Sequence, residues 1–64
     1  MKKQSDDGYI IEYIELGGSM KVTAFDPRSL REVSIIAPPS TSRAELARLA
    51  IRKLHYVEKN KDTD

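Results

Sequence analysis

The stretch YIIEYIELGGSMKVTAF, residues 9–25, decides the fold. Its first half, Tyr9 to Leu16, is rich in the aromatic and β-branched residues that favour strands. Gly17-Gly18-Ser19 follows, and a glycine pair can supply the positive φ that a tight turn requires. Met20 to Phe25 then alternates apolar and polar residues with the period of two that is typical of a strand. The stretch therefore predicts a β-hairpin.

A third strand is expected after the hairpin. Asp26-Pro27-Arg28-Ser29 has the composition of a turn, because Pro27 fixes φ at the first corner and the Asp26 side chain can bond the backbone two residues on. Glu32 to Ala37 has the pattern of the next strand. Pro38-Pro39 ends it, since proline donates no hydrogen bond to a sheet.

A helix start is the clearest local signal in the chain. Ser42-Arg43-Ala44-Glu45 fits a capping box, with Ser42 as the N-cap. From Arg43 to about Glu58 there is no glycine or proline, and strong helix formers dominate. The apolar residues gather on one arc of this helix: Leu46, Ala47, Ala50, Leu54 and Val57, with Leu49 and Ile51 at its flanks. We expect an α+β fold, a three-stranded antiparallel sheet (β-β-β) followed by one C-terminal α-helix that covers one face.

Length and composition indicate a single small domain. The chain has 64 residues, of which 39% are hydrophobic and 33% are charged, and it has no cysteine for a disulfide or a thiolate metal site. We expect a flexible lead over residues 1–8, one domain over residues 9–58 and a frayed tail over residues 59–64. A chain of this size without covalent staples is at the limit of independent stability, and oligomerisation is a common remedy.

The strand pattern predicts such a partner. The first strand is apolar on both faces: Ile10, Ile14 and Leu16 alternate with Tyr9, Ile11 and Tyr13. One helix covers only one face, so we expect a single chain to leave Ile11, Tyr13, Phe25 and Ile36 partly exposed. The sequence therefore favours a homodimer.

Two dimer geometries are open at this point. The sheets could pack face to face across a two-fold axis, or the helices could be exchanged between subunits in a domain-swapped, intertwined dimer about residues 34–41. Pro38-Pro39 would stiffen such a hinge, although the pair could equally do no more than end the strand. The candidate interface residues are Ile11, Tyr13, Phe25, Ile36, Pro38, Pro39, Leu49 and Ile51.

A basic ridge on the helix supports an alternative, a nucleic-acid-binding dimer. Arg48, Arg52, His55 and Lys59 lie within a narrow arc opposite the apolar residues. Against this function, acidic residues flank the ridge and the net charge is only +1. A solvated helix face is the favoured interpretation, and a protein partner is expected before a nucleic acid.

Catalytic chemistry is not indicated. His55 is the only histidine, and the sequence pairs it with no nucleophile or orienting carboxylate, so a small hydrolase or transferase around it ranks last. The segment Gly17 to Lys21 lacks the spacing of a phosphate-binding loop and joins two strands. We expect no enzyme activity, no catalytic residue, no cofactor and no metal. No apolar run is long enough for a membrane span, and we expect a cytoplasmic protein without a membrane partner.

Three motifs carry a family resemblance: KVTAFDP at residues 21–27, EVSI at residues 32–35 and RKLHYV at residues 52–57. On these motifs the chain resembles a small family of uncharacterised alphaproteobacterial proteins over roughly residues 9–58. The resemblance implies the β-β-β-α fold and an intertwined dimer, and it transfers no catalytic residue. Such proteins often have a glycine in the second turn, where this chain has Ser29-Leu30-Arg31.

Overall fold

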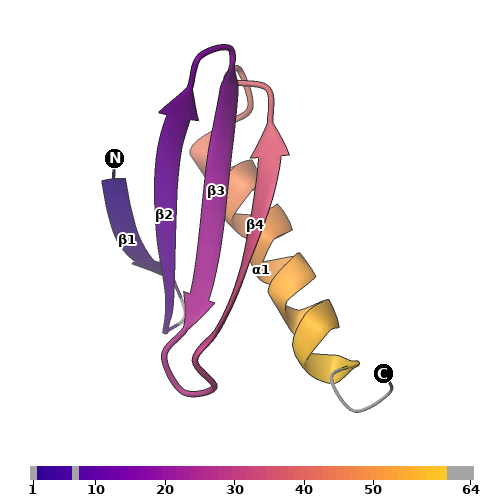
Figure 1. Ribbon diagram of the computed structural model, residues 1–64. Helices are drawn as coiled ribbons and strands as arrows, with labels where there is room; N and C mark the ends of the chain where they lie inside the picture. The colour runs from indigo at the N-terminus through magenta and orange to yellow at the C-terminus, as the bar shows by residue number, and fades with distance from the viewer. Residues whose placement is uncertain (1, 7, 61–64) are drawn as a thin grey trace.

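The protein is a two-layer sandwich of one antiparallel sheet and one helix (Figure 1). The computed structural model describes residues 2–6 and 8–60. Four strands follow one another in the sheet in chain order, and the helix comes last. The elements are β1 (Lys2–Asp6), β2 (Tyr9–Leu16), β3 (Ser19–Asp26), β4 (Arg31–Ala37) and α1 (Arg43–Lys59). The predicted three strands and C-terminal helix are confirmed, and the sheet has one strand more.

The additional strand β1 corrects the expectation of a flexible lead over residues 1–8. Residues Lys2–Asp6 pair antiparallel with β2, from Lys2 opposite Tyr13 to Asp6 opposite Tyr9. The segment is polar and shows no alternation of apolar residues, so its composition does not predict a strand. Backbone hydrogen bonds to β2 hold it in the sheet. Asp7-Gly8 is a dipeptide typical of hairpins, and this local signal could have indicated β1.

The turn between β2 and β3 is the predicted glycine hairpin. Leu16 pairs with Ser19, which leaves the two glycines as the connection. Gly17 has φ 59° and Gly18 has no positive φ. Positive φ at only the first of two turn residues is characteristic of the type II′ turn, whose twist matches that of the strands.

The turn between β3 and β4 uses Asp26 as predicted and places a strained residue at its end. The Asp26 carboxylate accepts a hydrogen bond of 2.9 Å from the backbone N–H of Arg28. The backbone N–H of Leu30 donates to the carbonyl of Asp26 at 2.8 Å. This closure holds Leu30 at φ 63°, a conformation that favours glycine.

Helix α1 begins at the predicted capping residue. The Ser42 hydroxyl accepts a hydrogen bond of 3.2 Å from the backbone N–H of Glu45, while the Glu45 carboxylate accepts one from Arg48. At the other end, the backbone N–H of Asn60 bonds the carbonyl of Tyr56 at 3.1 Å. The helix thus ends at Lys59, one residue beyond the predicted boundary.

The core lies between α1 and the face of the sheet that carries Tyr9, Ile11 and Tyr13. Ile11 and Leu54 are fully buried, and burial of a side chain of this size contributes about 1.5–3 kcal/mol. The buried apolar residues are Tyr9, Ile11, Tyr13, Val22, Ala24, Val33, Leu46, Ala47, Ala50 and Leu54. The expectation that Ile11 and Tyr13 are exposed in a single chain is therefore wrong, because the helix covers their face. Among the described residues, no helix is long and apolar enough to cross a membrane.

Candidate functional site

The face of the sheet that points away from α1 is not covered by any other described element of the chain. The strand register decides which side chains share it, since alternate residues point to opposite faces. Its members on β2, β3 and β4 are Ile10, Glu12, Ile14, Leu16, Ser19, Lys21, Thr23, Phe25, Glu32, Ser34 and Ile36. We call this set the open face. Ile36 is 60% exposed and Leu16 is 49% exposed.

A shallow hollow of ≈ 330 Å³ lies on the open face, at the half nearest the β3–β4 turn. Its lining is Ile10, Glu12, Thr23, Phe25 and Glu32. Thr23 and Ser34 share a hydrogen bond of 2.8 Å between their hydroxyl groups across β3 and β4. Because these hydroxyls satisfy each other, the centre of the face can be dehydrated at lower cost than unpaired polar groups would require.

The charges of the open face are separated by sign. Glu12 and Glu32 lie in the half that contains the hollow, whereas Lys21 lies opposite Ile14, further toward the β2–β3 hairpin. No ion pair among residues 8–60 involves any of these three side chains. Over β2, β3 and β4 the face therefore has two acids in one half and one base in the other, with apolar side chains in both, while Lys3 of β1 lies opposite Glu12 in the strand register.

The structure divides the predicted interface residues into four groups. Phe25 and Ile36 lie on the open face, as the dimer prediction requires. Pro38 and Pro39 are exposed in the connection between β4 and α1. Leu49 and Ile51 are half-buried on α1. Ile11 and Tyr13 belong to the core. The apolar residues that β2 presents on the open face are Ile10, Ile14 and Leu16, which the sequence did not single out as interface residues.

The basic ridge of Arg48, Arg52, His55 and Lys59 is exposed on α1. Two of its members have partners within the chain: Arg48 pairs with Glu45, and His55 bonds Tyr9. These contacts reduce the number of donors that could face a phosphate backbone. Nucleic-acid binding by the ridge stays a prediction from the sequence.

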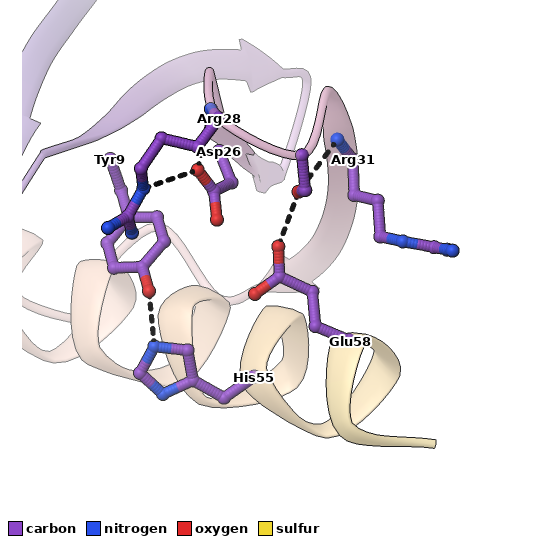
Figure 2. A network of polar contacts seen from close by, with 7 residues as sticks. Tyr9, Asp26, Arg28, Arg31, His55 and Glu58 are labelled. Atoms are coloured by element: carbon purple, nitrogen blue, oxygen red, sulfur yellow. Dashed lines mark hydrogen bonds and ion pairs between the residues drawn. The ribbon is translucent and has the colours of Figure 1, made fainter. Parts of the chain in front are cut away.

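A second polar feature connects the β3–β4 turn to the C-terminal half of α1 (Figure 2). The Tyr9 hydroxyl and His55 Nε2 share a hydrogen bond of 2.6 Å, and the guanidinium of Arg28 lies 5.7 Å from the centre of the Tyr9 ring. The Ser29 hydroxyl donates to the Glu58 carboxylate at 2.6 Å. We call these residues, together with Asp26, the turn–helix cluster. The Tyr9–His55 pair is 46 residues apart in the chain and the Ser29–Glu58 pair is 29 apart, so no local sequence signal could reveal these two contacts.

Asp26 is the buried charge of the turn–helix cluster, with 4% of its surface exposed. The hydrogen bond from the backbone N–H of Arg28 is the main reason that the pKa of this carboxyl lies below its ordinary value. The side chains of Glu58 and Arg28 lower the pKa further, against the opposing effect of burial. Asp26 is thus an ionised structural acceptor that holds the turn.

The hydrogen bonds of the turn–helix cluster join β2 and the β3–β4 turn to helix α1. His55 has the partner that the sequence did not reveal, yet that partner is a tyrosine whose body is packed in the core, and Asp26 is bonded to Arg28. A nucleophile–base–orienter series is not formed by these contacts. Within residues 8–60, no group of three potential ligands could hold a metal ion.

A comparison with family models identifies the chain. The model for Domain of unknown function (DUF6898) matches residues 6–61. The chain belongs to the DUF6898 family. Neither the curated proteins nor the solved structures give a significant match. The predicted resemblance to an uncharacterised family is confirmed to that extent, and the DUF6898 match includes the last part of β1, all of β2 to β4 and α1.

Proposed function

We propose that this DUF6898 domain is a non-enzymatic interaction module that forms a homodimer through the open face. The observation that carries the proposal is the chemistry of that face. Ile10, Ile14, Leu16, Phe25 and Ile36 lie on one side of the sheet, and α1, the one helix among the described residues, covers the other side. Uncovered apolar patches on small domains typically mark interfaces.

A second copy of the chain is the occupant that the charges favour. Over β2 to β4 the open face carries acid in one half and base in the other, so an inverted copy of these strands presents the opposite charge to each half. An isologous two-fold interface requires this kind of self-complementarity. A dimer also removes from water the apolar side chains that α1 cannot reach.

Face-to-face packing is favoured over helix exchange. Helix α1 lies on the sheet of its own chain and buries Leu46, Ala50 and Leu54 there, after a short connection through Pro38-Pro39. The single chain therefore already completes its helix–sheet core, and exchange would create no new contact of this kind. Cytoplasmic location, alphaproteobacterial origin and the absence of enzyme activity stay predictions from the sequence.

Sedimentation equilibrium of the purified protein tests the proposal. We expect a dimer at tens of micromolar, and we expect Ile36→Lys to sediment as a folded monomer because it places a charge among the apolar side chains of the contact, next to Lys21. Tyr56→Lys is the matched control, since Tyr56 is similarly exposed at 69% but lies on the helix, and it should leave the dimer intact.

A monomeric wild-type protein under these conditions would overturn the proposal. So would a dimer that Ile36→Lys leaves unchanged while Tyr56→Lys dissociates it, because the interface would then lie on the helix. Circular dichroism of each variant checks that loss of the dimer is not loss of the fold.

A further inference from the structure

We propose that the two open faces meet about a two-fold axis that runs across the strands near Val22 of β3, which sets Glu12 against Lys21 of the partner subunit. This inference rests on the proposed homodimer and specifies its geometry and its charge recognition. It assigns Glu12 and Lys21, which form no ion pair with another side chain of residues 8–60, to reciprocal ion pairs. Each pair occurs twice because the interface is isologous.

The strand register places Glu12 and Lys21 in neighbouring rows of the open face, one row on each side of this axis. Glu12 of β2 pairs with Thr23, and Lys21 of β3 pairs with Ile14. Successive residues on one face are about 7 Å apart along a strand, and neighbouring strands are about 5 Å apart. An axis that crosses β3 at Val22 exchanges the row of Glu12 with the row of Lys21. The carboxylate of one subunit then faces the ammonium group of the other from the adjacent strand.

Only two directions of the two-fold axis bring the faces together with their strands aligned, and the charges distinguish them. An axis parallel to the strands superposes β3 on its own copy without inversion, so Lys21 meets Lys21 of the partner subunit. It also gathers Glu12 and Glu32 of both chains at one end. Like charges in a desolvated interface are strongly unfavourable. The axis across the strands avoids both conflicts.

The apolar side chains fit the same arrangement. Inversion of the strands brings Ile10 of β2 over Leu16 of the partner subunit, since these residues lie at opposite ends of the open face. The hollow beside Ile10 and Phe25 then receives the Leu16 side chain, which is otherwise 49% exposed at the end of its strand. Sheets that pack face to face are about 10 Å apart and cross at about 30°, and charges near the axis are displaced least by that rotation.

A charge-reversal experiment tests the arrangement. In Glu12→Lys, both reciprocal pairs become Lys–Lys, and in Lys21→Glu both become Glu–Glu. We expect each variant alone to self-associate at least about 100-fold more weakly than the wild type. An equimolar mixture of the two variants restores two opposite-charge pairs per dimer. We expect this mixture to form a heterodimer within about tenfold of wild-type affinity, measured by sedimentation velocity or native mass spectrometry.

Two controls keep the test specific. Glu15→Lys makes the same change in the same strand on the opposite face of the sheet, and it should leave the dimer constant within about twofold. Arg52→Glu repeats the loss of a cation on the exposed helix, with the same expectation. Circular dichroism establishes that all four variants are folded.

The outcomes separate this inference from the proposed function. If the wild type is monomeric, the homodimer itself is wrong. If the wild type is a dimer and Glu12→Lys and Lys21→Glu each dimerise as tightly as it does, the homodimer stands and the cross-strand arrangement is overturned. Two variants that weaken the dimer alone but do not associate with each other would also overturn it, because the two charges would then not face one another.

Discussion

Leu30 is the residue whose conformation departs most clearly from its type. A left-handed backbone costs an L-residue about 1–2 kcal/mol, whereas glycine adopts it freely. The side chain of Leu30 is 74% exposed, so burial returns little of that cost. The strain is concentrated in the turn, next to the Asp26 hydrogen bonds that close it.

We predict that Leu30→Gly raises the free energy of unfolding by about 0.5–1 kcal/mol, the relief of strain less the added entropy of the unfolded chain. Urea denaturation of both proteins at equal concentration measures it. Leu30→Ala is the control, because alanine keeps the strain and should give no such gain. A loss of stability in Leu30→Gly would show instead that the leucine side chain makes a stabilising contact.

Asp26 gives the fold a dependence on pH. Its pKa is lower in the folded protein than its ordinary value of 3.8, because Arg28 and its backbone N–H stabilise the ionised carboxylate. The stabilisation is therefore present above that ordinary value and is lost as the pH falls through the lower folded value.

We predict that Asp26→Asn unfolds at lower urea than the wild type at pH 7, and that the difference shrinks as the pH falls below about 4. The amide can still accept the N–H of Arg28 but has no charge to lose. Glu15→Gln removes an exposed carboxylate and should show no comparable loss at pH 7. A gap between Asp26→Asn and wild type that stays constant down to pH 2 would contradict this role.

At the scale of elements, helix α1 buries apolar side chains on one side only, whereas the sheet carries apolar side chains on both of its faces. Helix α1 is anchored by a buried stripe that includes Leu46 and Leu54, whose side chains are fully buried against β3 and β4. Lys53, beside this stripe, donates to the carbonyl of Ser34 in the edge strand β4 at 2.8 Å. The same helix therefore closes the core and occupies one hydrogen-bonding group of an edge that could otherwise pair with another chain.

We predict that Leu54→Ala lowers the free energy of unfolding by about 2–5 kcal/mol, from lost burial and the cavity left behind. A domain of this length has only about 3–10 kcal/mol in total, so thermal unfolding should show a marked loss of folded protein. Leu49→Ala is matched, since Leu49 is a half-buried leucine of the same helix, and its cost should be clearly smaller. Equal effects of the two substitutions would mean that the described core is wrong.

At the scale of the whole molecule, periodicity and turn chemistry predicted the order of elements but not the orientation of the sheet. The alternation in β2 separated its two faces correctly, yet both are apolar enough to lie beneath a helix. The local pattern could not show whether Ile10 or Ile11 faces the helix, and the packing of α1 places Ile11 in the core. The strand β1 was not predicted, because it is held to β2 by backbone pairing, and this pairing does not require apolar side chains.

The candidate site shows the same limit. The sequence predicted an uncovered apolar surface, because one helix cannot cover both faces of a sheet, and it identified Phe25 and Ile36 on that surface. The separation of Glu12 from Lys21 depends on strand register, and the contact between Tyr9 and His55 depends on how α1 docks. Both require the complete fold.

An isotope-filtered nuclear Overhauser experiment on a mixed dimer tests the central claim most directly. One half of the molecules carries ¹³C-labelled methyl groups and the other half is unlabelled. We predict contacts between subunits from Ile10 and Ile36 on the open face, while the contacts of Leu54 with the core side chains of β3 and β4 arise within one chain. Intersubunit contacts from Leu54 to that core, with none from the open face, would contradict the account and establish an exchanged helix.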